Sequence, residues 1–135
     1  DYGKPPEGIK VISMSTWAQY VLDNHATVTE AVADLRKENF RVQTLVLSTG
    51  RPANMHLALS DATGDSAVFE YVDAKLVIHH GKQFKVMTNS PTYDKQLPIM
   101  EYWKEAGGLT KSLPGTSRAA DHFVRATYLL DLLPV

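Results

Sequence analysis

The sequence predicts an α/β fold of the α+β kind, in which helical segments flank an antiparallel sheet. Apolar residues recur at helical spacing near both ends of the chain, whereas in the middle they alternate with polar residues as they do in strands. The predicted strands are short and are joined by short turns, which favours antiparallel pairing. With 135 residues, of which 44% are hydrophobic, the chain is long enough to form one domain with a buried core.

Two helical segments are expected before the sheet. In the first, Ser13 or Ser15 is available as the N-cap. The apolar residues of this segment at helical spacing are Met14, Trp17, Tyr20 and Val21. The second segment begins with a capping-box pattern formed by Thr27 and Glu30. The apolar face of this second segment comprises Val28, Ala31, Val32 and Leu35. We expect both apolar faces to lie in the core.

Alternating apolar residues and clusters of turn residues predict five strands in the centre of the chain. These strands cover residues 40–46, 55–60, 66–72, 76–79 and 83–88. The third and fourth are separated by Asp73-Ala74, and because alanine disfavours a positive φ, we expect a turn longer than a two-residue hairpin. Asp61, Asp65 and Glu70 fit roles in turns and at strand edges.

Two more helices are expected after the sheet. The first has apolar residues at helical spacing, namely Leu97, Met100, Tyr102 and Trp103. We expect Gly107-Gly108 to end this helix, because glycine is the usual residue just past a helix C-terminus. Thr116 or Ser117 is expected to cap the last helix.

The charged and histidine-containing patterns are weak indicators of a site when taken alone. Arg118, His122 and Arg125 share one face of the last predicted helix, which is typical of a solvated basic stripe. The adjacent His79 and His80 would point to opposite faces of a strand and could not chelate one metal ion. No group of histidines or carboxylates has the spacing of a metal site, so neither a metal nor a cofactor is expected.

The composition excludes several classes of protein. A net charge of −1 argues against a nucleic-acid partner that is bound by phosphate neutralisation. No apolar run is long enough to cross a bilayer, so no membrane partner is expected. The 135 residues include no cysteine and hence no thiolate nucleophile, disulfide or cysteine-based metal site.

The most informative stretch of the chain covers residues 86–97. Pro91 has no backbone donor and restricts Ser90, so the strand over residues 83–88 is expected to end there. The Asn89 carboxamide would then be held at a strand end on rigid backbone, where hydrolytic enzymes place a donor for an oxygen that gains negative charge. The alternative is ordinary turn chemistry, because asparagine before Ser-Pro is common in turns.

Four segments in order along the chain resemble the choloylglycine hydrolase family, which includes penicillin V acylases and bile salt hydrolases. They are residues 17–23 (WAQYVLD), 56–71 (HLALSDATGDSAVFEY), 87–94 (MTNSPTYD) and 113–126 (LPGTSRAADHFVRA). The resemblance implies part of the αββα fold of the N-terminal-nucleophile hydrolases. On this basis, residues 1–135 are expected to form the central and C-terminal part of one domain.

The same resemblance implies a linear amide C–N hydrolase that acts on a small-molecule amide. Such substrates are the side-chain amide of penicillin V and the glycine and taurine conjugates of bile acids. The family's nucleophile is an N-terminal cysteine whose α-amine serves as the base. Asn89 matches the family's oxyanion asparagine and is therefore a predicted catalytic residue.

Two departures from the family pattern affect this prediction. Because no cysteine is present, we expect an internal piece of a longer enzyme that is inactive alone and has the missing N-terminal segment as a partner. His122 is the other predicted catalytic residue, but the family has an arginine at this place before Phe-Val-Arg, so its charge role would be degraded. A non-catalytic binding or regulatory module that keeps the hydrolase fold is the alternative. A homo-oligomer, and a periplasmic or cytoplasmic location in a bacterium, stay open.

Overall fold

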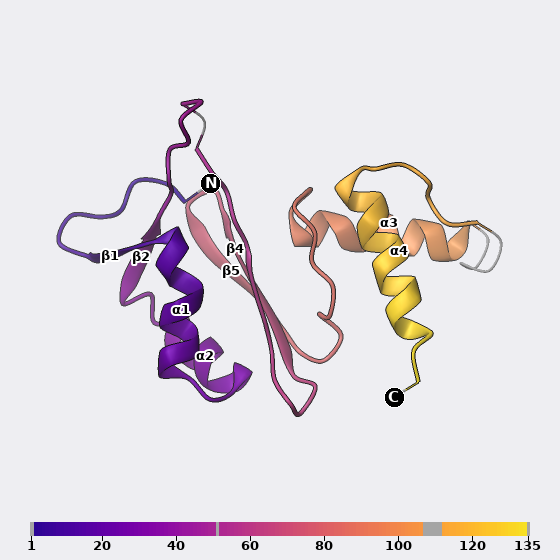
Figure 1. Cartoon of the computed structure of the whole chain (residues 1–135), viewed down its shortest axis with the longest axis horizontal. Helices are drawn as coiled ribbons and strands as arrows, with labels where there is room; N and C mark the ends of the chain where they lie inside the picture. The colour runs from indigo at the N-terminus through magenta and orange to yellow at the C-terminus, as the bar shows by residue number, and fades with distance from the viewer. Residues whose placement is uncertain (1, 51, 107–111, 135) are drawn as a thin grey trace. The chain divides into compact units, whose positions relative to one another are not determined.

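The structure, a computed structural model, describes residues 2–50, 52–106 and 112–134. The chain forms two compact units, Asp1–Phe84 and Lys85–Val135, which are described in turn (Figure 1). Helices and strands are both present and the larger sheet is antiparallel, so the predicted fold class is confirmed.

The first unit contains a parallel pair of strands that the sequence did not indicate. β1 (Lys10–Ser13) pairs with β2 (Phe40–Gln43), with Lys10 opposite Phe40 and Ser13 opposite Gln43. β1 has only four residues, so its alternation is too short to be recognised. β2 is shorter than the predicted strand over residues 40–46. The pairing can be parallel because two helices connect the strands.

Those two helices, α1 (Met14–Asn24) and α2 (Val28–Leu35), begin where the capping residues predicted. The Ser13 hydroxyl oxygen accepts a hydrogen bond from the Ser15 backbone N–H at 3.2 Å. The Thr27 hydroxyl oxygen accepts one from the Glu30 N–H at 3.2 Å, and the Glu30 carboxylate accepts one from the Ala26 N–H at 2.8 Å. Because these interactions are local, the sequence was sufficient to predict both helix starts.

The larger sheet has the order β3 (Leu57–Ser60), β4 (Ser66–Val72) and β5 (Lys75–His80), and all its pairings are antiparallel. One face of the sheet packs on α1 and α2 (Figure 1). The Trp17 ring lies 6.5 Å from that of Phe69 and 5.9 Å from that of Tyr71, measured between centroids. Phe69 is fully buried, so this contact forms the centre of the unit's core.

The turn between β4 and β5 differs from the prediction. Val72 pairs with Lys75, which leaves Asp73 and Ala74 as a two-residue loop with φ values of 48° and 64°. The expectation of a longer turn was wrong because tertiary contacts hold Ala74 in this conformation. The Arg41 guanidinium donates a hydrogen bond to the Ala74 carbonyl oxygen at 3.2 Å. A Cβ atom on Gly3 would lie only 2.3 Å from that of Ala74, so the glycine lets the N-terminal segment approach the turn.

The segment that leads from the first unit into the second is not a strand. Residues 83–88 were predicted to form the fifth strand, but the structure assigns no strand to them, so this prediction was wrong. The Phe84 N–H bonds to the Gly81 carbonyl oxygen at 3.0 Å, and this turn redirects the chain after β5. An alternating pattern cannot form a strand without a neighbouring strand to pair with.

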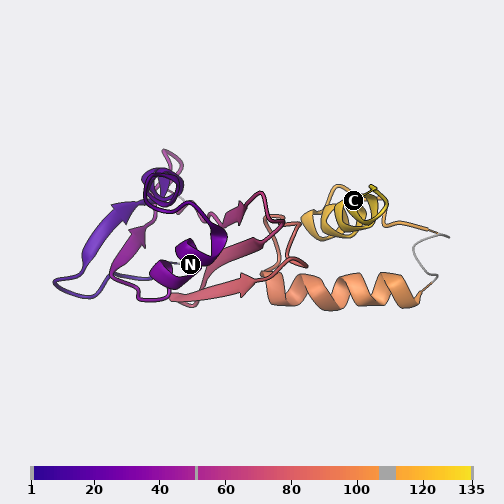
Figure 2. The ribbon, with the colours of Figure 1, turned by 90° about the horizontal axis from the view of Figure 1, so that it is seen from below.

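Two helices complete the second unit, α3 (Tyr93–Glu105) and α4 (Ala119–Asp131), and they lie side by side (Figure 2). The Tyr93 and Phe123 rings pack edge to face with centroids 5.5 Å apart. The predicted helix stop at Gly107-Gly108 lies outside the described residues. The N-cap of α4 is Arg118, which makes no side-chain capping bond, so the prediction of Thr116 or Ser117 as the cap was wrong.

Candidate active site

Asn89 lies in the irregular segment that precedes α3, and it is exposed to solvent. The peptide bond between Ser90 and Pro91 in this segment is cis. The expectation that Asn89 stands at a strand end was therefore wrong, because the structure assigns no strand to the residues before it. The segment is instead hydrogen-bonded to a side chain of α3.

That side chain is Gln96, which is 1% exposed. Its amide nitrogen donates hydrogen bonds to the carbonyl oxygens of Thr88, at 3.1 Å, and Pro91, at 2.6 Å. Its amide oxygen accepts a hydrogen bond from the Thr88 hydroxyl at 2.9 Å. The sequence reasoning missed Gln96, although it shares helical spacing with Tyr93 and Met100, which are also buried. A polar residue on an otherwise apolar helix face is the signal that could have identified it.

His122 is exposed on α4, and Arg118, the N-cap residue just before this helix, is exposed as well. Arg125 has a different role, because its guanidinium donates hydrogen bonds to the carbonyl oxygens of Pro114 and Thr116. The predicted basic stripe is therefore divided into an exposed pair and one cation bound to the chain that precedes the helix.

The first turn of α4 also contains a carboxylate, that of Asp121, which accepts hydrogen bonds from Thr116. The Thr116 hydroxyl donates a hydrogen bond to Asp121 at 2.5 Å and is the largest cause that lowers the pKa of this carboxyl, with smaller contributions from Arg125 and Arg118. Asp121 is therefore ionised beside the exposed pair at neutral pH.

The two predicted catalytic residues lie on segments that are bonded to each other. The Thr88 hydroxyl, next to Asn89 in the chain, lies 3.0 Å from the Ala119 carbonyl oxygen. Ala119 is the first residue of α4, one helical turn before His122. The structure thus places both residues in the second unit and connects their backbones through Thr88.

The first unit contains a buried acidic group that the sequence reasoning placed wrongly. Glu70 was expected at a strand edge, but it lies in the central strand β4 and is 1% exposed. Its carboxylate lies 2.6 Å from His56 Nδ1 and 3.8 Å from His79 Nε2. His56 directly precedes β3 and His79 lies in β5, the two strands that flank β4. Sequence spacing alone could not show that these residues surround Glu70.

Asp61 and Asp65 have the turn roles that were predicted. The Asp61 carboxylate accepts hydrogen bonds from Thr63 and, at 3.0 Å, from the Val28 N–H at the start of α2. These bonds, that of the Thr63 hydroxyl first, lower the pKa of Asp61 to about 2. The Asp65 carboxylate lies 2.8 Å from His80 Nε2.

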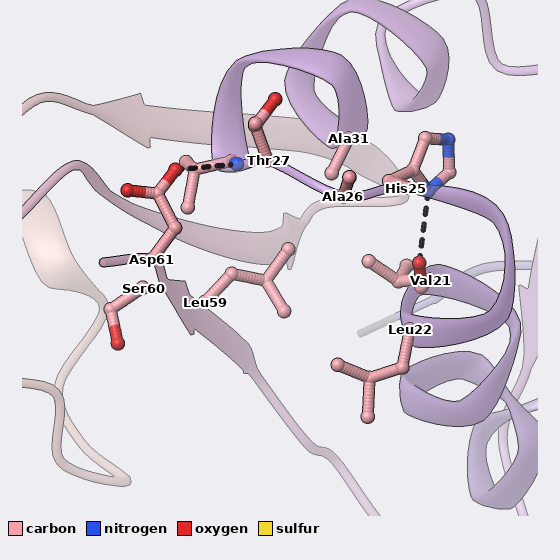
Figure 3. Close-up of a pocket in the computed structure, with 10 residues that line it drawn as sticks. Val21, Leu22, His25, Ala26, Thr27, Ala31, Leu59, Ser60 and Asp61 are labelled. Carbon is pink, nitrogen blue, oxygen red and sulfur yellow. Dashed lines mark hydrogen bonds between the residues drawn. The ribbon is translucent and has the colours of Figure 1, made fainter. Parts of the chain in front are cut away.

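A small hollow lies between α1, α2 and β3 (Figure 3). Its volume of about 80 Å³ is far below the roughly 300–1,000 Å³ of typical ligand pockets. The polar groups beside it are engaged, because Asp61 binds the Val28 N–H and His25 contacts the Val21 carbonyl oxygen at 3.0 Å and the Asp34 carboxylate at 3.3 Å. The hollow is therefore a packing feature of the first unit.

The described part of the chain has neither a metal-binding cluster nor a membrane-spanning helix. It contains no group of three or more histidines or acidic residues arranged to hold a metal ion. Within the same residues, no helix has the length and apolar character needed to span a bilayer.

Comparison with known proteins identifies the relatives of this chain. Residues 1–134 match the family model described as linear amide C–N hydrolases, choloylglycine hydrolase family. The chain is 54% identical over 126 residues to a penicillin V acylase of Pectobacterium atrosepticum, an alignment that covers 93% of this chain and 33% of the relative. It is 27% identical over 148 residues to a bile salt hydrolase/transferase of Clostridium perfringens, covering 94% of this chain and 44% of that protein. The chain thus spans less than half the length of these relatives.

Solved structures show the same likeness. A penicillin V acylase from Agrobacterium tumefaciens matches with a TM-score of 0.84 and 49% identity, covering 99% of this chain and 39% of that one. A variant of the conjugated bile acid hydrolase from Clostridium perfringens matches with a TM-score of 0.75 and 26% identity, covering 95% and 44%. The predicted likeness to N-terminal-nucleophile hydrolases is confirmed by these matches. The chain therefore belongs to the choloylglycine hydrolase family of linear amide C–N hydrolases.

Proposed function

We propose that this chain contributes the oxyanion-stabilising part of a linear amide hydrolase of the penicillin V acylase type. The observation that carries the proposal is the 54% identity with a penicillin V acylase across 93% of the chain. The identity with the bile salt hydrolase/transferase is 27%, so a conjugated bile acid is the second substrate class.

In this proposal the nucleophile comes from polypeptide outside the 135 residues, because these include no cysteine. The thiolate of an N-terminal cysteine attacks the amide carbonyl carbon and forms a C–S bond. Collapse of the tetrahedral intermediate breaks the C–N bond, and the α-ammonium group of the cysteine gives its proton to the leaving amine. Water then hydrolyses the thioester. The chain's span of one third of the acylase supports a nucleophile located elsewhere.

Asn89 is the proposed donor to the oxygen that becomes negatively charged in this intermediate. Its carboxamide is an uncharged donor in an exposed position, on backbone whose flanking carbonyls are bound by Gln96. Such preorganised donors need no reorganisation during the reaction, and removal of one typically costs about 2.7–4 kcal/mol of transition-state stabilisation.

His122 is the proposed remnant of a cationic substrate-site group. It is exposed and stands one helical turn after the exposed Arg118. An arginine at this position would carry a permanent charge and a planar set of donors, which a histidine lacks. We therefore expect the natural His122 to support weaker activity than an arginine would.

The test is a chimera in which residues of this chain replace the matching segment of the Pectobacterium acylase. Release of free amine would be measured with penicillin V and, in parallel, with a glycine-conjugated bile acid. We expect turnover of penicillin V, a decrease in kcat of about 100- to 1,000-fold for Asn89→Ala, and an increase in kcat/KM of about tenfold for His122→Arg.

The matched control is Asn24→Ala, which removes an exposed asparagine whose amide bonds to the Tyr20 carbonyl oxygen in the first unit. This variant should leave kcat unchanged. A chimera that is folded but inert, even with His122→Arg, would contradict the proposal.

That result would favour the second candidate, a binding or regulatory module without catalysis. The absence of cysteine and the histidine at position 122 are the observations that favour it. Calorimetry of the 135-residue chain with penicillin V or a conjugated bile acid would then detect binding without hydrolysis.

A further inference from the structure

We propose that Gln96 is a positioning residue for Asn89, acting by holding the backbone on both sides of it. This inference rests on the proposed function, because it assumes that Asn89 is the oxyanion donor. Gln96 itself would not touch the substrate. It would act by fixing where the Asn89 carboxamide stands.

The burial of Gln96 needs a physical reason. A buried amide is unfavourable unless its donors and acceptor are bonded, and an apolar side chain would pack on the same face of α3 as Tyr93 and Met100. The Gln96 amide is bonded at both ends. Its nitrogen binds the carbonyl oxygens of Thr88 and Pro91, and its oxygen accepts from the Thr88 hydroxyl.

The two carbonyl groups that Gln96 binds are those of the residues immediately before and two positions after Asn89. In the described part of the chain, this segment has no hydrogen bonds of a β-ladder to order it. The hydrogen bonds from Gln96 take the place of such a ladder. A donor must be held within about 0.5 Å of its productive position to act on an oxyanion, and a displacement of about 1 Å can reduce a rate about 100-fold.

Thr88 extends this network to α4. Its hydroxyl lies within hydrogen-bonding distance of both Gln96 Oε1 and the Ala119 carbonyl oxygen, so one side chain joins the Asn89 segment to α3 and α4. Loss of the Gln96 amide would therefore free the Asn89 segment and weaken its tie to the helix that carries His122. Side-chain hydrogen-bond networks of this kind can be worth more than the sum of their single bonds, so removal of one member affects the others.

The experiment compares Gln96→Met with a matched control, Gln19→Met, in the chimera described above. Methionine has a similar length but cannot donate a hydrogen bond. Gln19 is exposed, and its amide nitrogen donates a hydrogen bond at 2.6 Å to the Asp23 carboxylate within α1. With kcat expressed per active-site thiol, as counted by titration, we expect Gln96→Met to lower kcat about 10- to 100-fold. The KM should change less than about twofold. Gln19→Met should change neither kcat nor KM.

A double-mutant cycle separates positioning from general stabilisation. In the Asn89→Ala background, Gln96→Met should cause no further loss of kcat, because the group that it positions is absent. An equal loss in both backgrounds would overturn the inference and indicate a structural role. If Asn89→Ala is itself without effect, the proposed function fails, whereas an effect of Asn89→Ala with none of Gln96→Met refutes the positioning role alone.

A second measurement does not require activity. Hydrogen–deuterium exchange of the 135-residue chain should be faster over residues 86–92 in Gln96→Met, and unchanged there in Gln19→Met. Unchanged exchange over residues 86–92 in Gln96→Met would overturn the inference, since the segment would then be ordered by other means.

Discussion

The two units of the chain use their polar side chains in different ways. In the first unit, histidine side chains contact carboxylates. These contacts are His25 with Asp34 at 3.3 Å, His56 with Glu70 at 2.6 Å and His80 with Asp65 at 2.8 Å. In the second unit, Asn89, Arg118 and His122 are exposed, while Gln96 and Arg125 donate hydrogen bonds to backbone carbonyls. The difference teaches that the first unit uses polar side chains for contacts within its own fold, whereas in the second unit buried or half-buried polar side chains hold backbone near exposed ones.

The largest expected effect concerns the core of the first unit. Phe69→Ala should lower the free energy of unfolding by about 3–5 kcal/mol, because a fully buried ring leaves a cavity against Trp17. Urea unfolding would be followed by Trp17 fluorescence in a Trp103→Phe background. Leu22→Ala, which removes a side chain from a residue that is 68% exposed, is the control and should change stability by less than about 0.5 kcal/mol. Equal effects of the two substitutions would contradict the proposed core.

The next effect tests whether the basic stripe of the second unit is divided. Arg125→Gln should destabilise this unit by about 2 kcal/mol, because two backbone carbonyls lose a charged donor. Arg118→Gln should alter stability by less than about 0.5 kcal/mol, since Arg118 is exposed. Thermal unfolding followed by Trp103 fluorescence in a Trp17→Phe background would measure both. Similar losses for the two variants would show that the stripe acts as one structural element.

The smallest effect depends on pH and concerns Asp61 in the first unit. Its pKa is lowered to about 2, so the stabilisation from its ionised form is present above about pH 4 and is lost as the pH falls through 2. Asp61→Asn should therefore lower the Tm at pH 7, and the difference from the natural protein should shrink towards pH 2. Calorimetry at pH 7, 4 and 2.5 would follow this, with Asp23→Asn on the exposed side of α1 as the control. A difference that is independent of pH would mean that the Asp61 charge does not contribute.

Predictability from sequence depends on whether the contacts that shape an element are local. The starts of α1 and α2 were predicted because Ser13 and Thr27 bond within their own helices. β1 and the Ala74 turn were not, since the first needs a distant parallel partner and the second is held by Arg41. Within the candidate site, Asn89 was identified through a family resemblance, whereas the Gln96 contacts that hold its segment were missed.

By itself, the sequence determined the family, the helices and the bounds of β4, because caps, periodicity and motifs are properties of adjacent residues. Only the tertiary structure decided that Glu70 is buried between His56 and His79, and that Gln96 binds the carbonyls on either side of Asn89. The physical reason is that a buried polar group must find its partners wherever the fold brings them, and these partners come from separate segments.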